Sequence, residues 1–534
     1  MFVYSLRYFF LSRELPQLYI KLGMSSEGKN FVSSFSWNTA TVVLQILIQL
    51  GYTAILARLI APESFAVMGI VLSLMGFAEI FSQIGLGPAL IQRKDITQDH
   101  LNSAFTTSLL LGLVFTLFFI AISPVLGSVY RIPLLEEIVP VVCTSFTISS
   151  LSVVPRNLMM KEMRFRAFFT ASMLSIVGGN LLVGLLLAYS GFQIWAYVWA
   201  LFAQNALMTI ACWILQPTRV QLQWKKKATL ELLNYGAGSS LFNALNYAAT
   251  KVDVTLTPMF SQGSWIFPNS ISLNSAGLYE RGAYVASLPI TIMAKLSDSV
   301  LFSGMSKLQD ELQKLQRIVL AATNALSLLS FAVSSFVIVF SEELLSFYLG
   351  SQYASGHWVV KWLFVAVVFR SLTRPIDSLL RAKAAVYRGS KIKLIYFLLM
   401  VTGVLIGGRF GSEYVAISIA ITTAIHYVMM VYFANSLIQL SIKKQMTALL
   451  PGIRAGLVVA LVSVLMKYIS DRIDAPMWIA LILGSLGVAI GGLALAYFRP
   501  MWLGERSINP LFVIPERVRK IPFLRKVYEA FDEE

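Results

Sequence analysis

Two arginines and an aspartate lie at helical spacing within one apolar stretch of the chain. Arg370, Arg374 and Asp377 occupy positions i, i+4 and i+7, and therefore share one face of a predicted helix. Planar guanidinium groups bind phosphate oxygens two at a time, so this face suits a phosphate-bearing ligand. In a membrane such a face cannot point at lipid; it faces a water-filled cavity or a protein partner. The structural alternative pairs Arg374 with Asp377 as a clamp.

A second group of charged residues lies in two neighbouring apolar segments. Lys251 and Asp253 are two residues apart, hence on roughly opposite sides of a helix, so only one can face a cavity directly. Glu280 and Arg281 are expected at the same depth of the next segment. The group either binds a sugar, couples a cation, or forms a structural network between helices.

Three further charged residues complete the candidates. Lys295 and Asp298 are three residues apart, so they either neutralise each other or contact a ligand, and Glu79 is a lone carboxylate that suits a proton site. Each intramembrane charge costs about 2.5–3.5 kcal/mol at a helix centre, which makes such residues candidates for function. The ligand-binding candidates are Arg370, Arg374, Lys295, Lys251 and Arg281, and the ion-coupling candidates are Asp253, Glu79, Glu280, Asp298 and Asp377.

Long apolar segments carry these residues, and a helix needs about 20 such residues to cross a membrane. The sequence predicts fourteen segments, at residues 31–57, 64–90, 101–128, 134–155, 167–189, 193–215, 230–260, 276–303, 316–340, 357–380, 392–408, 412–438, 446–468 and 476–498. A hydrophobic content of 57%, a charged content of 13% and a mean hydropathy of +0.71 indicate an all-α polytopic membrane protein.

The basic residues predict the orientation of these segments. Most of the 43 Lys and Arg residues lie in the N-terminal tail, in alternate loops and in the C-terminal tail. By the positive-inside rule these parts and both termini are cytoplasmic. The net charge of +16 then forms an inner rim that meets anionic membrane lipids, and no nucleic-acid partner is expected. The opposite loops hold only Arg58, Arg131, Arg409, Lys467 and Arg472.

The segments are expected to form two six-helix lobes in a pseudo-twofold arrangement, followed by two more helices. Similar helix starts at Ser33-Ser34 and Ser239-Ser240 favour such a parallel repeat, with a substrate site between the halves. In the N-terminal tail, either Phe2 to Leu11 form an interfacial turn or translation begins at Met24. The expected parts are a cytoplasmic tail at 1–29, an N-lobe at 30–216, a cytoplasmic linker at 217–229, a C-lobe at 230–440, two added helices at 441–499 and a basic cytoplasmic tail at 500–534.

Several motifs resemble a known family. The run Leu56–Phe65 followed by Phe81–Arg93 resembles the opening hairpin of Wzx-type polysaccharide flippases, in the colanic-acid-exporter-like branch of the multidrug/oligosaccharidyl-lipid/polysaccharide superfamily. Gly277-Leu278-Tyr279 with Pro289 resembles the eighth helix of these proteins, and Leu344–Tyr353 resembles their ninth-to-tenth connection.

The likeness covers roughly residues 30–440 and implies a flippase that exports a polyprenyl-diphosphate-linked oligosaccharide for surface polysaccharide synthesis. It also implies alternating access, a bacterial inner-membrane location, and other polysaccharide assembly proteins as candidate partners. Because the sequence has no motif for ATP hydrolysis, uphill transport must draw on a proton or sodium gradient or on substrate supply. Ser303-Gly304 departs from the pattern where a proline is expected, and residues 261–275 resemble an added outer loop.

Other classes remain as alternatives. A multidrug or cation antiporter of the same superfamily is the runner-up, whereas a membrane-embedded glycan polymerase would need a larger outer loop with catalytic residues. No P-loop, kinase loop, nucleophile elbow or zinc motif occurs in the sequence, so no enzyme activity or cofactor is expected. Cys143 and Cys212 form no disulfide or metal pattern.

Overall fold

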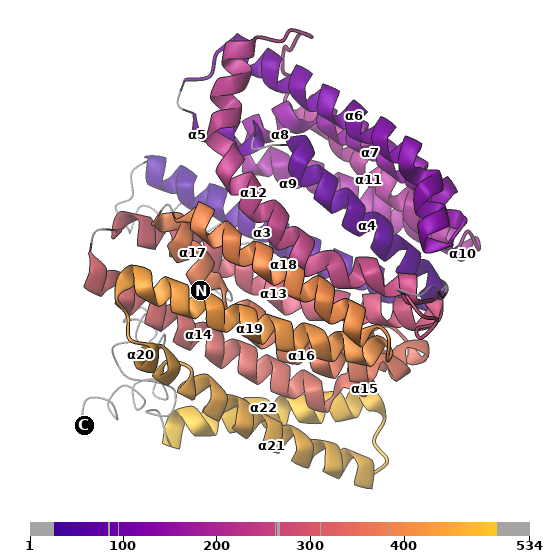
Figure 1. The fold of residues 1–534 in the computed structure, drawn as a ribbon, viewed down its shortest axis with the longest axis vertical. Helices are drawn as coiled ribbons and strands as arrows, with labels where there is room; N and C mark the ends of the chain where they lie inside the picture. Colours follow the sequence, from indigo (N-terminus) through magenta and orange to yellow (C-terminus); the bar gives the residue numbers. More distant parts are fainter. Residues whose placement is uncertain are drawn as a thin grey trace. The chain divides into compact units, whose positions relative to one another are not determined.

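The computed structural model describes residues 26–498, except for residues 84–85, 94, 262, 264–266, 310 and 384 (Figure 1). Every regular element in these ranges is a helix, which confirms the all-α class for the described residues. The expected N-terminal turn, the alternative start at Met24 and the basic tail lie outside them.

A helix lies in each of the fourteen predicted segments. The first part of the chain contains α3 (Ser26–Leu59), α4 (Pro62–Gln83), α5 (Leu86–Gln92), α6 (Gln98–Tyr130), α7 (Leu134–Leu151), α8 (Val153–Lys161), α9 (Phe165–Ile176), the π-helix η1 (Val177–Gly184), α10 (Leu185–Tyr189), α11 (Ile194–Leu215) and α12 (Lys226–Leu256). The rest contains η2 (Thr257–Ser261), α13 (Leu273–Lys307), α14 (Leu312–Val339), α15 (Ser341–Tyr348), η3 (Ser351–Gly356), α16 (His357–Leu372), α17 (Arg374–Ala382), α18 (Val386–Gly407), α19 (Ser412–Ile438), α20 (Ile442–Thr447), α21 (Leu450–Arg472) and α22 (Met477–Phe498).

The helices differ in how well they suit a membrane by composition alone. Within the described ranges, nine are long and apolar enough to cross a bilayer, and Pro62–Phe77 and Met477–Leu493 are shorter apolar helices. The predicted segments that remain are α12, α13 and the pair α16–α17. These elements carry every charged candidate except Glu79, and charged residues within a membrane are candidates for function.

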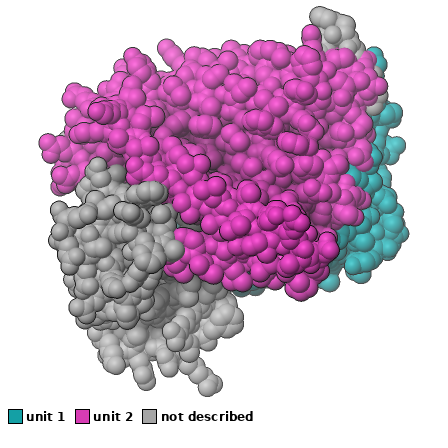
Figure 2. All heavy atoms as spheres, turned by 90° about the horizontal axis from the view of Figure 1, so that it is seen from below, with its two compact units in different colours: residues 1–244 teal, residues 245–534 magenta. Residues whose placement is uncertain are grey.

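The chain forms two compact units, coloured teal and magenta in Figure 2. Unit 1 ends at Ala244 and unit 2 begins at Leu245, so the division falls within α12. The sequence analysis instead places the end of the N-lobe at residue 216 and a linker at 217–229.

The predicted linker is bound to unit 1, which explains this difference. The Asn102 side-chain carbonyl accepts a hydrogen bond from the Gln221 backbone N–H (3.0 Å), and the Ser103 hydroxyl accepts one from the Lys225 backbone N–H (3.1 Å). Glu231, one turn into α12, forms an ion pair of 2.6 Å with Arg93. Hydrogen bonds and an ion pair therefore hold the segment and the start of α12 against the loop before α6 and the first turns of α6.

The predicted helix at residues 357–380 is divided into α16 and α17 at Thr373. Pro375 lies in the first turn of α17 and has no N–H to donate to the preceding turn. The series of backbone hydrogen bonds that would join α16 and α17 into one helix is therefore interrupted. Arg370 is therefore in the last turn of α16, whereas Arg374 begins α17. The expectation that Arg370, Arg374 and Asp377 line one continuous helix is corrected on this point.

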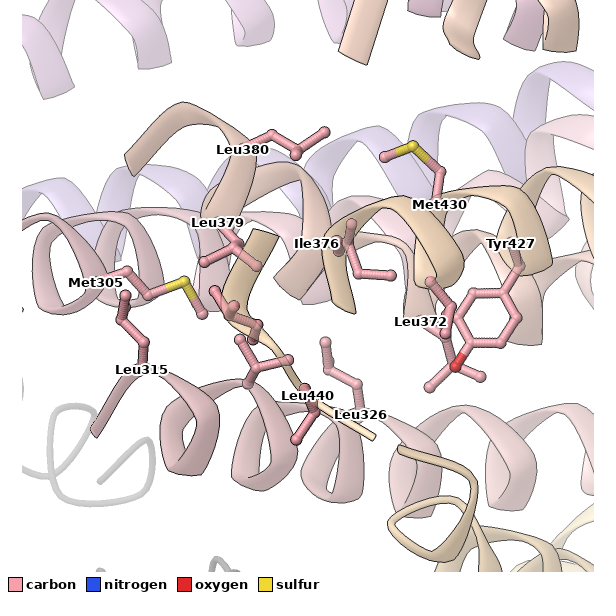
Figure 3. Close-up of a cluster of buried hydrophobic side chains, with 14 of the residues drawn as sticks. Met305, Leu315, Leu326, Leu372, Ile376, Leu379, Leu380, Tyr427, Met430 and Leu440 are labelled. Carbon is pink, nitrogen blue, oxygen red and sulfur yellow. The ribbon is translucent and has the colours of Figure 1, made fainter. Parts of the chain in front are cut away.

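A hydrophobic core in unit 2 fixes the position of α17. Figure 3 shows side chains from α13, α14, α16, α17 and α19 converging on it, among them Met305, Leu315, Leu379 and Met430. These four side chains are fully buried. Because α17 is short, this packing rather than helix propensity holds the helix in place.

Candidate functional site

A buried carboxylate on α12 begins a polar network inside unit 2. Asp253 is 2% exposed, and its Oδ2 atom accepts a hydrogen bond of 3.0 Å from the hydroxyl of Tyr279 on α13. Its other oxygen, Oδ1, is buried and has no hydrogen-bond partner among the described residues. Burying a carboxylate is unfavourable unless it is neutralised or hydrogen-bonded, so this half-satisfied group requires a nearby positive charge.

Arg370 supplies that charge. Its guanidinium group interacts electrostatically with Asp253, Tyr279 and Tyr396, which lie on α12, α13 and α18. The Nε and Nη2 atoms of Arg370 are buried, and neither has a hydrogen-bond partner within the part of the chain that the structure places. A buried guanidinium and a buried carboxylate thus interact electrostatically, and each keeps atoms that a further ligand can bind.

Two aromatic rings extend the network to α19. The rings of Tyr396 and His426 are stacked, with centroids 4.0 Å apart and an angle of 18° between their planes. The Tyr396 hydroxyl lies 3.5 Å from the Thr423 hydroxyl. The charges of Arg370 and Lys393 both act on His426, so the stacked pair belongs to the same charged network.

An ion pair completes the network on the side of α17. Lys393 Nζ lies 3.2 Å from Asp377 Oδ1 and 3.4 Å from Oδ2, and the two residues are 1% and 8% exposed. Arg374 and Arg381 add further positive charge around Lys393. Asp377 therefore has a cationic partner on α18, in addition to the arginines near it in sequence.

Sequence reasoning missed Lys393, Tyr279, Tyr396 and His426. Lys393 stands in a run of basic residues at the start of the predicted segment 392–408, and such a run predicts only a cytoplasmic helix end. The sequence does indicate that Lys393 and Tyr396 lie on the same face of the helix, because residues at i and i+3 are neighbours on a helix surface. Tyr279 belongs to the motif Gly277-Leu278-Tyr279, but neither this motif nor the sequence around His426 indicates contact with the charged residues, because only packing brings them together.

Glu280 and Arg281 form a separate pair on α13. Arg281 Nε and Nη2 donate hydrogen bonds of 2.5 and 2.8 Å to the two carboxylate oxygens of Glu280. The guanidinium also lies over the ring of Tyr284, 5.0 Å from its centroid. Both residues are buried, and the pair neutralises its own charge.

The remaining candidates are placed as follows. Lys251 is half-buried on α12. Lys295 and Asp298 lie on α13, but their side chains are outside the described residues. Glu79, on α4 in unit 1, is exposed and lines a cavity of about 300 Å³. The structure thus links Asp253 with Arg370 and Asp377 with Lys393 in one network, whereas Glu79 lines a cavity in unit 1.

Comparisons with known proteins agree with the sequence motifs. A family model described as polysaccharide biosynthesis protein matches residues 55–356, more than half of the chain. The lipopolysaccharide biosynthesis protein WzxC of Escherichia coli (strain K12) is 22% identical over 388 residues, or 71% of this chain and 75% of that protein. The teichuronic acid biosynthesis protein TuaB of Bacillus subtilis (strain 168) is 22% identical over 404 residues, or 72% and 78% of the two chains.

Solved structures share the fold. The lipid II flippase MurJ in its inward closed conformation has a TM-score of 0.68 and 13% identity, and the match covers 87% of this chain and 99% of that one. An inward-facing multidrug resistance MATE family transporter of the MOP superfamily has a TM-score of 0.63 and 15% identity, with coverage of 74% and 94%. The predicted all-α membrane-transporter fold is therefore confirmed.

Proposed function

The chain belongs to the polysaccharide biosynthesis protein family, and from this we propose that it moves a polyprenyl-diphosphate-linked oligosaccharide across the bacterial cytoplasmic membrane for surface polysaccharide synthesis. The observation that carries the proposal is the family match over residues 55–356, on a chain that has the fold of known membrane transporters. The named relatives WzxC and TuaB are lipopolysaccharide and teichuronic acid biosynthesis proteins, which supports a glycan substrate.

The substrate chemistry explains why charged residues lie within the helices. The polyprenyl tail stays in lipid, while the diphosphate and the glycan need a polar route. Arg370 binds the diphosphate, because its buried donors Nε and Nη2 suit phosphate oxygens. The other cations proposed along the route are Arg374, Lys295, Lys251 and Arg281.

Asp253 is the proposed site of ion coupling. Its Oδ1 atom has no hydrogen-bond partner among the described residues and can accept a proton or bind a sodium ion. The carboxylate also interacts electrostatically with the guanidinium of Arg370. A cation on the carboxylate therefore changes the affinity of Arg370 for an anion, and by linkage the anion changes the affinity for the cation. Crossing 100 mV is worth about 2.3 kcal/mol per charge, which is enough to bias an alternating-access cycle. The other proposed coupling residues are Glu79, Glu280, Asp298 and Asp377.

Deletion of the gene in its host tests the function. We expect loss of the surface polysaccharide and accumulation of lipid-linked glycan in the cytoplasmic leaflet, and both effects should be reversed by a plasmid copy. Unchanged surface polysaccharide with no accumulated intermediate would contradict the proposal.

A multidrug or cation antiporter is the second candidate, favoured by the shared fold with the MATE transporter. Expression in cells that lack their main efflux pumps separates the two functions. A flippase should leave the sensitivity to cationic drugs unchanged, whereas an antiporter should raise the resistance without any effect on glycan export.

A further inference from the structure

A polar cavity in unit 1 has no part in the network described above. It occupies about 300 Å³ between α4, α7, α8 and α11. Its lining is mixed, with an arginine, a carboxylate, two amides and three serine hydroxyls beside five apolar side chains, three of them methionines. Drug-sized ligands prefer predominantly apolar and aromatic cavities, whereas this lining suits a ligand with many hydroxyl or phosphate groups.

The polar groups are held in place by their own helices. Asn157 and Asn205 each donate one side-chain hydrogen bond to a carbonyl four residues earlier, at 2.7 and 3.0 Å. This fixes the amide groups and leaves the Oδ1 atom and the second N–H of each available to a ligand. Ser145 is 2% exposed, and its hydroxyl has no hydrogen-bond partner among the residues that the structure describes. A buried hydroxyl without a hydrogen-bond partner is stabilised when a ligand forms a hydrogen bond with it.

Among the described residues that line the cavity, Arg156 is the one cation and Glu79 the one acid. The Arg156 guanidinium lies over the ring of Phe168, 5.9 Å from the centroid, which supports one face of the group. Its edge N–H groups can still donate to phosphate oxygens. A carboxylate repels a bare anion but accepts hydrogen bonds from sugar hydroxyls, so the pair selects a ligand that carries both phosphate and sugar.

Three polar residues of the lining lie near helix ends that adjoin the basic loops. Glu79 is in the last turns of α4, Ser149 in the last turn of α7, and Arg156 in α8, which follows α7 directly. By the charge asymmetry of the sequence, these ends are cytoplasmic. A ligand that begins its passage on the cytoplasmic side would meet this cavity early.

We propose that this cavity is a binding site for a glycosyl diphosphate, in which Arg156 binds the diphosphate and Glu79 with Asn205 binds the first sugar. The inference rests on the proposed function, because it names the site at which that same substrate first binds from the cytoplasmic side. Two kinds of molecule carry a glycosyl diphosphate, a lipid-linked glycan and a soluble nucleotide sugar. We expect the lipid-linked glycan to bind.

The first experiment measures glycan export by variants in the deletion strain. Arg156→Ala should lower export, because a lost hydrogen bond between charged groups weakens binding by roughly tenfold to hundredfold. Arg156→Lys should retain part of it. The matched control is Arg166→Ala, an exposed arginine at the start of α9 that does not line the cavity. Equal export by the Arg156→Ala and Arg166→Ala proteins, at equal protein levels, would overturn the proposal.

Phe168→Leu separates binding from packing. It removes the ring under Arg156 but leaves the charge beside the cavity. If Arg156 acts only by packing on this ring, Phe168→Leu should reproduce the full defect of Arg156→Ala, and that result would also overturn the proposal. A much smaller defect supports the binding role.

The second experiment tests occupancy directly. Ser149→Cys is introduced into a chain with Cys143→Ala and Cys212→Ala, and inside-out membrane vesicles are treated with N-ethylmaleimide. Labelling should be slower in vesicles that contain the lipid-linked glycan than in vesicles from cells unable to start its synthesis. UDP-glucose added to the latter should not protect, and labelling of Leu222→Cys, in an exposed loop, should be the same in all vesicles.

Equal labelling of Ser149→Cys in all vesicles would exclude the site, and protection by UDP-glucose alone would reassign it to nucleotide sugars. These outcomes are distinct from failure of the proposed function. In that case the parent chain itself would not restore export in the deletion strain, and the vesicle comparison would show no accumulated intermediate.

Discussion

At the scale of single residues, unit 2 contains charges that are stable only as a group. Lys393 and Asp377 are almost completely buried, with Lys393 Nζ 3.2 Å from Asp377 Oδ1, and Arg370 interacts electrostatically with Asp253. Desolvation of an isolated charge costs several kcal/mol, so each of these residues depends on its partner. In such a network, removal of one charge should destabilise the protein far more than removal of a complete pair.

Single and double substitutions of the ion pair test this dependence. Lys393→Met and Asp377→Asn alone should each destabilise the protein by about 3–5 kcal/mol, because each leaves one buried charge without its partner. The double variant should recover most of the loss. Thermal unfolding of the detergent-solubilised protein measures the effect, and a double variant as unstable as the sum of the single ones would argue against a coupled pair.

Arg370 provides the test of the diphosphate site. Arg370→Ala should reduce glycan export by roughly tenfold or more, since the bidentate donors are lost. Arg370→Lys should be intermediate, because it keeps the charge but not the planar fork. Arg388→Ala, an exposed arginine on α18, is the control.

Protein level in the membrane must be followed in these strains. The Arg370→Ala protein lacks the positive charge that interacts with the buried Asp253, and this loss can also impair folding. Normal expression with export at the parental rate would refute the role of Arg370. A defect confined to protein level would assign it to folding.

At the scale of elements, α21 is held against α14 by close contact. α21 lies against α14, as Figure 1 shows, and a Cβ atom at Gly452 would come within 2.5 Å of the Ser327 carbonyl carbon. The Gln445 amide just before α21 also donates a hydrogen bond of 3.0 Å to the Thr323 hydroxyl of α14. Small residues at such contacts let two helices approach closely within a membrane, where packing drives their association.

Gly452→Ala tests this contact. The added methyl group meets backbone atoms that cannot move aside, so we expect a destabilisation of about 1–3 kcal/mol. Gly492→Ala on α22 is the matched control, because a Cβ atom there would have no neighbour within 4 Å in the described part of the chain. Fluorescence-detected thermal stability of tagged proteins compares the two, and equal melting temperatures would contradict close packing at Gly452.

At the scale of the whole molecule, the prediction that matters most is orientation. The basic residues place the loop at 217–229 in the cytoplasm and the loop after η2 outside. The first of these is bound to unit 1, where Lys225 also forms an ion pair of 2.7 Å with Asp99.

Labelling of single cysteines checks the orientation. In a chain with Cys143→Ala and Cys212→Ala, a membrane-impermeant maleimide added to intact spheroplasts should modify Asn269→Cys and spare Lys226→Cys, because both positions are exposed but lie on opposite sides. Permeabilised cells should label both. The reverse pattern in intact spheroplasts would invalidate the predicted helix order.

The sequence by itself determined the class of the protein. Apolar segments of membrane-spanning length are encoded locally, so the all-α fold could be predicted, and a helix was found in each predicted segment. The motifs of the first hairpin also predicted the family, which the match over residues 55–356 confirmed. Intramembrane charges such as Arg370 and Asp253 stood out for the same reason, since each is costly in an apolar segment.

The tertiary structure alone decided which charges meet. Spacing along a helix suggested Arg374 as a partner of Asp377, but it could not show that Lys393, on a different helix, forms a buried pair with it. Helix periodicity describes neighbours within one element, whereas contacts between elements depend on how those elements pack. For the same reason Tyr279 and the cavity beside Arg156 were visible only once the helices were assembled.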